Sequence, residues 1–245
     1  MEQKTTLIKI GDFFFKYRNF IFPIFLVVLL LGKRPPSEYF GSEEAEDVVD
    51  TIAVILALAG LSLRGAVIGF SYIKRGGLNK KVYAENLVTD GFFAVCRNPL
   101  YVGNILIYAG LLLKHGDLLV LVLGSAFFLF VYTAIVAAEE YFLRNGFGDA
   151  YREYCRDVPR WRMKWPRLKA ATEGMKFNLK KALVKDYGTI INVVVTLTIL
   201  EMLEQTSAAE SAEPPNWFMF AAIIGCVIAM GLVVRVAKRR GVLKA

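Results

Sequence analysis

Apolar residues along this chain gather into blocks of roughly twenty, separated by short polar stretches. A helix rises 1.5 Å per residue, so about twenty predominantly apolar residues cross about 30 Å of hydrocarbon. Four blocks meet or nearly meet this length, at Thr51–Tyr72, Leu118–Ala138, Tyr187–Leu203 and Trp217–Val236. Two shorter blocks are weaker candidates: Pro99–Leu113, and Phe20–Leu31, which can gain length from residues 13–15. The pattern predicts an all-α fold, a polytopic integral membrane helical bundle of about six transmembrane helices.

Basic residues alternate with acidic or neutral stretches at every predicted crossing. With six spans, 26 of the 30 Lys and Arg fall on one side of the membrane. The positive-inside rule makes that side, and both termini, cytoplasmic. The net charge of +8 is therefore a topology signal, and it does not indicate nucleic-acid binding. The opening MEQKTTLIKIGD lacks the pattern of a cleavable signal peptide.

The segment between the fourth and fifth predicted spans, residues 139–186, is long and rich in Arg, Tyr and Trp. Its end, Lys176–Lys185, is basic with apolar interleaving, which predicts a stretch at the membrane surface. We place a boundary near Ala170. It divides a membrane core (residues 1–170) from an amphipathic linker and C-terminal transmembrane hairpin (residues 171–245). The hairpin is expected to anchor the chain, to form a homodimer, or to line a tunnel for a lipid.

The cysteines and the histidine argue against a metal centre. The three cysteines lie far apart and show no metal-ligand spacing, so they are predicted to be free thiols. The only histidine, His115, falls in the short external connection between the third and fourth spans, where an ordinary loop residue is expected. One histidine does not make a metal site of the usual kind.

Two polar groups stand at the ends of neighbouring predicted spans. The run RNPLY (97–101) leads into the third span, and the pair Glu139-Glu140 follows the fourth. Only residues 114–117 join these spans, so they form an antiparallel hairpin that brings both groups to one membrane face. Taken singly, RNPLY also fits a helix start with an interfacial tyrosine, and the glutamates also fit a solvated helix end. Together they favour a functional site, because charges at a membrane are costly.

These motifs carry a resemblance. LVTDGFFAVCRNPLYVGN, followed by EEYFLRNGFGDAYREYCRDVPRW, resembles the isoprenylcysteine carboxyl methyltransferase and phospholipid methyltransferase superfamily of integral membrane enzymes. Its members show Arg-His-Pro-x-Tyr-x-Gly entering a helix, a Glu-Glu pair ending the next, then Phe-Gly-x-x-Tyr-x-x-Tyr and Val-x-Arg. The match runs from about Gly60 to Pro166. Phe92 and Ala94 depart from the family pattern, and Asn98 replaces its histidine. Asparagine cannot shuttle a proton near neutral pH, so a structural role is the one that carries over.

The resemblance implies an S-adenosylmethionine cofactor between the third and fourth spans and the cytoplasmic segment after them. By position, the implied cofactor-binding residues are Arg97, Asn98, Pro99, Tyr101, Gly103, Glu139, Glu140 and Tyr151. The residues expected to contact substrate are Arg64, Arg144 and Arg160, and those expected to be catalytic are Arg160, Glu140 and Tyr154. The implied reaction methylates a lipidic or lipid-anchored acceptor at the cytoplasmic face. The acceptor is the carboxylate of a prenylcysteine-like group or a lipid head group.

Arg64 lies inside the second span, about 12 Å from its cytoplasmic end. It fits structural or lipid-phosphate pairing as well as a role in the site. In the same span Gly65 and Gly69 have GxxxG spacing, which predicts close helix packing. Two other functions stay open: a membrane reductase or isomerase on a related scaffold, and a non-enzymatic membrane scaffold or transporter. A transporter would carry its polar residues nearer the bilayer midplane.

Overall fold

The computed structural model describes residues 4–36, 43–70, 84, 86–208, 215–241 and 243. These residues form an all-helical fold in which no strand occurs. The long helices are α1 (Thr6–Leu31), α2 (Glu43–Phe70), α3 (Pro99–His115), α4 (Leu118–Asp157), α6 (Leu179–Ala208) and α7 (Trp217–Arg239). Short elements are η1 (Gly91–Ala94), η2 (Trp165–Arg167) and α5 (Leu168–Ala171). The predicted span end at Tyr72 and the basic residues 74–81 lie outside the described residues.

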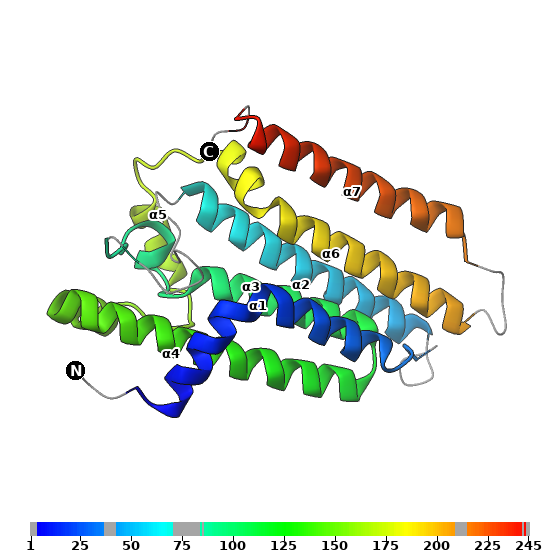
Figure 1. Cartoon of the computed structure of the whole chain (residues 1–245), viewed down its shortest axis with the longest axis horizontal. Helices are drawn as coiled ribbons and strands as arrows, with labels where there is room; N and C mark the ends of the chain where they lie inside the picture. Colours follow the sequence, from blue (N-terminus) through cyan, green and yellow to red (C-terminus); the bar gives the residue numbers. More distant parts are fainter. Residues whose placement is uncertain are drawn as a thin grey trace.

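The long helices run back and forth along one axis. α7 packs on α6, α6 on α2, α2 on α3, α3 on α4, and α4 on α1 (Figure 1). The start of α1 and the end of α7 lie at the same end of the bundle, which also carries α5 (Figure 1). Five helices, α1, α2, α4, α6 and α7, are long and apolar enough to cross a membrane. α3 has 17 residues and is the shortest of the six.

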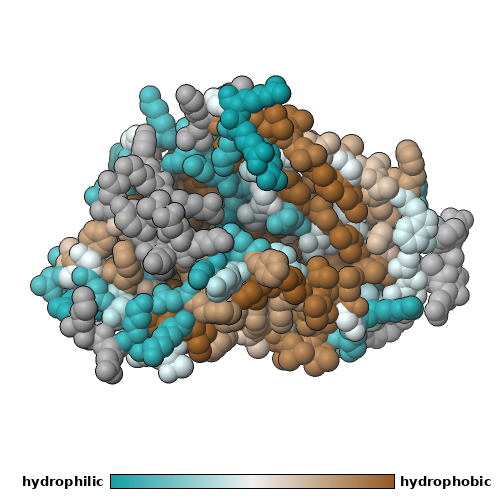
Figure 2. Space-filling model, viewed as in Figure 1, coloured by the Kyte–Doolittle hydropathy of each residue, from teal (hydrophilic) through white to brown (hydrophobic). Residues whose placement is uncertain are grey.

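The surface of the bundle is that of a membrane protein. In Figure 2 apolar residues cover the middle of the helices, and hydrophilic residues gather mainly toward the end that carries α5. Many large apolar side chains are exposed on the outer helices, for example Phe20 on α1 and Phe218 on α7, which are 71% and 85% exposed. Such a surface suits contact with hydrocarbon rather than water.

The helices are longer than the apolar blocks that predict them. α1 joins the two predicted N-terminal pieces into one helix that includes Pro23. α4 continues nineteen residues past Ala138, to Asp157, with a kink at Gly148, where φ is 51° and ψ is −122°. Glycine adopts this conformation without a side-chain clash. The basic residues 180–185, predicted at the membrane surface, form the first turns of α6.

Glycines bring α2 and α3 close together, but they are not the predicted pair. A Cβ on Gly60 would lie 2.5 Å from the Gly103 carbonyl oxygen, and one on Gly110 would lie 2.5 Å from that of Ala53. A Cβ on Gly65 would meet no described atom within 4 Å, so the prediction of close helix packing there is wrong. Gly60 lies five residues before Gly65 and so points about 140° away from it around α2, toward α3.

His115 is fully buried at the end of α3, so its prediction as a loop residue is wrong. Its Nε2 lies 3.1 Å from the carbonyl oxygen of Leu30 and 3.0 Å from that of Lys33. The helix runs two residues beyond the predicted end at Leu113 and stops at Gly116, whose φ is 82°. The imidazole therefore joins the end of α3 to the end of α1.

The contact between α1 and α4 gives a first prediction. A Cβ on Gly11 would lie 2.0 Å from the backbone oxygen of Ala134, which cannot move away without shifting α4. We expect Gly11→Ala to destabilise the fold by about 1–3 kcal/mol. Gly65→Ala is the matched control, and should be neutral or stabilising by up to about 1 kcal/mol. Thermal unfolding of the two purified variants checks this, and equal midpoints would contradict the packing.

Candidate functional site

The entry to α3 is shaped by backbone contacts with the segment that follows α4. The Arg97 N–H donates to the carbonyl oxygen of Pro159 at 2.9 Å, and the Lys164 N–H donates to that of Val95 at 3.1 Å. The Asn98 side chain donates to the carbonyl oxygen of Arg160 at 3.0 Å. Two segments about sixty residues apart in sequence are therefore held side by side.

Glu140 is the centre of this site. Its side chain is 5% exposed and accepts two hydrogen bonds from Arg160, one from Nε at 2.9 Å and one from NH2. Arg97 adds an ion pair, with NH1 3.1 Å from Oε1. A buried carboxylate needs such partners, and the planar guanidinium matches it in bidentate geometry. The structure thus brings together three of the predicted site residues, Arg97, Glu140 and Arg160.

The Arg97 guanidinium has further hydrogen-bond donors besides the one that faces Glu140. Its NH1 donates to the Cys155 sulfur at 2.8 Å, while Nε is buried without a hydrogen-bond partner among the described residues. Burial opposes its charge, but the Glu140 carboxylate outweighs burial and raises the pKa of the Arg97 guanidinium above its ordinary value. Tyr151 is buried nearby on the helical turn after Gly148. The site therefore holds a fixed positive charge and an unpaired donor.

Glu139 faces a different partner from its neighbour, because adjacent residues on a helix point about 100° apart. The Tyr101 hydroxyl donates to Glu139 Oε1 at 2.7 Å and accepts from Arg18 NH1 at 3.0 Å. The Arg18 guanidinium also lies 4.3 Å from the centre of the Phe15 ring. This chain of contacts joins α1, α3 and α4 beside the Glu140 cluster.

The remaining predicted residues are dispersed around this centre. Pro99 is buried in the first turn of α3, and the Tyr154 hydroxyl donates to the carbonyl oxygen of Phe93 at 2.7 Å. Arg144 is exposed on α4 and makes no ion pair within the described ranges. Gly103 faces α2, where a Cβ would lie 2.6 Å from Arg64 Cγ. In this structure, then, Tyr154 contacts the backbone and Gly103 contacts a side chain of α2.

Arg64 is buried and paired. Its Nε donates to Asp186 Oδ2 at 2.9 Å, its NH2 donates to Asp186 Oδ1, and its NH1 donates to Asn104 Oδ1 at 2.5 Å. Thr189 also donates to Asp186 at 2.9 Å. These contacts join α2, α3 and α6 next to Gly103, so the structure supports the expectation of structural pairing for Arg64.

Three contributors to the site were missed by sequence reasoning. Arg18 lies on α1, outside every quoted motif, and nothing in its local sequence marks it. Cys155 is a free thiol, as predicted, but its contact with Arg97 is not predicted, although it stands in the same run as Tyr151 and Tyr154. Asp186 stands between a basic stretch and an apolar one. A single acid at that place could have indicated a partner for the buried Arg64.

An apolar cleft of about 270 Å³ lies between α3 and α4. Its wall includes Val102, next to Tyr101, and Trp161, next to Arg160. The other lining residues are Ile105, Leu106, Leu129 and Thr133. Because Leu129 is half exposed on the outer surface, the cleft opens where lipid would contact the bundle. It connects the neighbourhood of the polar cluster with the apolar flank of the two helices.

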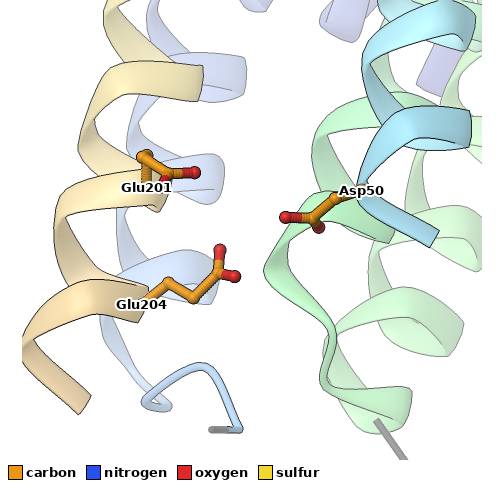
Figure 3. Close-up of side chains that lie close together, drawn as sticks. All are labelled: Asp50, Glu201 and Glu204. Atoms are coloured by element: carbon orange, nitrogen blue, oxygen red, sulfur yellow. The ribbon is translucent and has the colours of Figure 1, made fainter. Parts of the chain in front are cut away.

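A second charged cluster lies at the opposite end of α2, α3 and α6. Asp50, Glu201 and Glu204 point toward one another with ligand atoms within 4.8 Å, as a metal site would require (Figure 3). The Lys114 ammonium, however, bonds to all three, at 2.8 Å from Glu201 and 2.5 Å from Glu204. The ammonium thus fills the position that a metal ion would take, and the cluster joins three helices as an ion-pair network.

The two thiols of the site give a prediction on reactivity. Cys96 is fully buried, and burial raises the pKa of its thiol above the ordinary value, so the protein holds it protonated to a higher pH. Cys155 is partly exposed beside Arg97. We expect N-ethylmaleimide at pH 8 to modify Cys155 well before Cys96, and unfolding to remove the difference. Peptide mapping by mass spectrometry measures both rates, and equal rates in the folded protein would contradict this geometry.

Part of the chain matches a known protein family. A family model described as phospholipid methyltransferase matches residues 48–150, from α2 to just beyond the kink in α4. The predicted superfamily resemblance is confirmed. This methyltransferase-like region contains RNPLY and the glutamate pair, whereas Tyr151, Tyr154 and Arg160 follow it.

Two relatives each match about a third of the chain. Cobalt-zinc-cadmium resistance protein CzcN of Cupriavidus metallidurans is 37% identical over 84 residues, which make up 34% of this chain and 37% of that protein. The Protein-S-isoprenylcysteine O-methyltransferase of Schizosaccharomyces pombe is 33% identical over 90 residues, or 37% of each chain. The chain thus spans little more than a third of the length of these relatives. No solved structure gives a significant match.

Proposed function

We propose that this protein is an S-adenosylmethionine-dependent methyltransferase acting on a lipidic or lipid-anchored acceptor at the cytoplasmic membrane face. The observation that carries the proposal is the convergence of Arg97, Glu140 and Arg160 at one end of the α3–α4 hairpin, beside an apolar cleft. The methyltransferase-like region supports the reaction class. The apolar helices support a multi-pass membrane location.

The chemistry of the donor set fits the proposed cofactor. The buried, unpartnered Nε of Arg97 is suited to a carboxylate, which the methionine part of the cofactor carries. The carboxylates of Glu139 and Glu140 are suited to an ammonium group or to ribose hydroxyls. When bound, S-adenosylmethionine supplies an electrophilic methyl group on a sulfonium. We therefore assign Arg97, Glu139 and Glu140 to the cofactor, with Asn98, Pro99, Tyr101 and Tyr151 shaping the pocket around it.

Arg160 is the residue we assign to the acceptor. Its side chain is 39% exposed, and Nε and NH2 already bond Glu140, which leaves NH1 for an anionic group. A carboxylate acceptor is nucleophilic at pH 7 and needs no general base, so holding it in line with the methyl group supplies much of the rate. An amine or hydroxyl acceptor would need a base, for which Glu140 is the candidate, because the Tyr154 hydroxyl keeps its proton in the bond to the Phe93 carbonyl oxygen.

Arg64 and Gly103 take supporting roles in this proposal. The Arg64 donors are engaged by Asp186 and Asn104, so we assign this arginine to positioning α3 below the site rather than to the substrate. Gly103 lets the Arg64 stem lie against α3. Arg144 is exposed at the same end of α4, and we assign it to contact with an acidic acceptor or a lipid phosphate.

The apolar cleft between α3 and α4 is suited to the hydrocarbon part of the acceptor. It begins near Trp161, adjacent in sequence to Arg160, and its other lining residues are apolar except Thr133. A lipid chain could enter it from the bilayer without crossing water, while its head group stays near the guanidinium. This arrangement favours an acceptor with one long apolar chain next to an anionic or nucleophilic group.

We further propose that α3 crosses the membrane with the five longer helices, which gives six spans and two cytoplasmic termini. The alternating helix directions and the shared position of the two chain ends support this topology (Figure 1). Residues 1–170 would form the catalytic core and residues 171–245 the C-terminal hairpin, through which a homodimer could form. α7 packs mainly on α6 and leaves most of its large apolar residues exposed.

A metal-handling function is the second candidate raised by the comparisons, through the name of the bacterial relative. The acidic cluster that could hold an ion contains the Lys114 ammonium instead. The donor set present there therefore does not fit a metal ion, and we do not propose one.

Transfer of a labelled methyl group tests the proposed function. Purified protein in nanodiscs is incubated with methyl-labelled S-adenosylmethionine and a total membrane lipid extract, and labelled products are separated and identified. We expect label in a lipid fraction, reduced to background in Arg160→Ala. The exposed Arg152→Ala is the control and should retain the activity. Label confined to water-soluble products, or equal label in Arg160→Ala, would contradict the assignment.

A further inference from the structure

A cleft of about 290 Å³ lies where α2 ends and α6 begins, apart from the site described above. Its floor is made by the last residues of α2, Gly69 and Phe70, and by Phe177. Two lysines, Lys176 and Lys181, stand on its wall. The other lining residues are Asn178 and Leu179. The cleft therefore combines an apolar floor with positive charge.

The walls of this cleft are fixed by the backbone. The Asn178 N–H donates to the Gly69 carbonyl oxygen at 3.0 Å, and the Asn178 side chain accepts from the Lys181 N–H at 2.8 Å. Gly69 has no side chain, and a Cβ there would lie 2.1 Å from the Phe177 ring, so the ring packs directly on the end of α2. This geometry holds the two lysine-bearing turns against α2 rather than leaving them on a free loop.

Several lysines lie along the start of α6, beside the cleft. Lys185 is one helical turn from Lys181 on the first turns of α6, where two like charges repel. Lys176 and Lys185 are exposed and form no ion pair with the part of the chain that the structure describes. The nearest buried acid on this helix, Asp186, is already bonded to Arg64. The start of α6 therefore presents positive charge at the cleft.

The position of the cleft points to the ligand. α2 and α6 are both long and apolar enough to cross a membrane, and their apolar stretches meet the polar segment at this level. Phe177, Leu179 and Leu183 are about half exposed beside the lysines, as expected for side chains that enter the acyl boundary. Lysine chains with apolar stems reach from hydrocarbon to head groups in the same way.

From the cleft, its lysines and its place at the ends of α2 and α6, we infer that it binds the phosphate head group of an anionic phospholipid, with the acyl chains against Phe70 and Phe177. This inference rests on the membrane location of the helices and not on the methyltransferase reaction. The lipid would fix the junction between the membrane core and the C-terminal hairpin, because the cleft is built from both. A free phosphate offers the same charge without the acyl chains, so the two ligands can be separated.

The test compares lipid binding by matched variants. Delipidated full-length protein in detergent is titrated with phosphatidylglycerol, phosphatidylcholine or inorganic phosphate, and bound lipid is counted by native mass spectrometry. We expect tight retention of phosphatidylglycerol only, weakened roughly thirtyfold in Lys176→Gln/Lys181→Gln, since each lysine near a membrane surface contributes about 1 kcal/mol. The control Lys169→Gln/Lys180→Gln removes the same charge outside the lining of the cleft and should bind like the unaltered protein.

Each other outcome has a defined meaning. Equal weakening in both double variants would show general charge attraction and overturn the site. Equal retention of phosphatidylcholine and phosphatidylglycerol would overturn the anionic head group, and binding of inorganic phosphate with the same affinity would overturn the lipid. Circular dichroism and thermal unfolding establish that both variants are folded. Cofactor binding, measured on the same samples, is expected to persist in both, which separates this inference from the proposed function.

Discussion

Replacing Glu140 with glutamine is expected to abolish S-adenosylmethionine binding and methyl transfer, with a loss of about 100-fold or more. The carboxylate holds both Arg97 and Arg160, so the neutral side chain leaves two guanidinium groups facing each other without a counter-charge. Both the cofactor contacts and the acceptor contacts are then displaced together. Isothermal titration calorimetry on purified protein, followed by the labelled-methyl assay, measures the two losses.

Two further variants show whether the loss comes from the site. Glu153→Gln removes an exposed carboxylate from the same segment and should bind the cofactor normally. Arg160→Lys keeps the charge but loses the bidentate geometry, so cofactor affinity should be largely kept while turnover falls. Unchanged affinity in Glu140→Gln, with a normal unfolding midpoint, would remove the role assigned to this carboxylate.

Breaking the pair between Arg64 and Asp186 is expected to be the most destabilising single change in the membrane part of the bundle. Both side chains are at least 90% buried, with side-chain exposures of 7% and 4%. Removing one partner leaves the other charge buried and unpaired, which costs about 3–5 kcal/mol. Arg64→Met and Asp186→Leu should each lower the unfolding midpoint by several degrees or prevent folding.

The double variant Arg64→Met/Asp186→Leu is the informative measurement for this pair. Replacing both charges with apolar residues of similar volume is often neutral or stabilising, so much of the lost stability should return. A double-mutant cycle of thermal unfolding in detergent gives the coupling energy. Additive losses in the double variant would show that the pair is not coupled, and would favour a separate contact for Arg64 in the site.

Most of the fold could be predicted from the sequence, because each helix that crosses a membrane needs a block of about twenty apolar residues. All six apolar blocks became helices, including Pro99–Leu113. The prediction of a tight α3–α4 hairpin is confirmed, because only residues 116–117 separate the two helices and the helices pack directly on each other. Helix ends were less accessible. Polar residues continue a helix when tertiary contacts satisfy their side chains, as in α4 beyond Ala138, and hydropathy does not record such contacts.

The sequence predicts those parts of the site that the order and direction of the helices alone bring together. RNPLY and Glu140 meet because two antiparallel helices begin and end at one face, and Arg160 follows soon after. Contacts from other helices could not be deduced in this way, since Arg18 and Asp186 depend on which helices pack together. The burial of His115 shows the same limit, because its carbonyl partners are contributed by the end of α1.

The GxxxG spacing of two glycines did not predict where α2 packs on α3. The GxxxG pair pointed to Gly65, but helix contact depends on which face of α2 meets α3, and that face carries Gly60. The face is set by large-scale packing that a single sequence does not reveal. The charge pattern predicts which membrane face each loop lies on, and that orientation stays a prediction.

Binding of S-adenosylmethionine to the purified, full-length protein in nanodiscs tests the central claim most directly. Isothermal titration calorimetry should show one saturable site per chain, competed by S-adenosylhomocysteine and absent in Glu140→Gln. No binding of the cofactor to folded protein, or the same binding in Glu140→Gln as in the unaltered chain, would contradict the account.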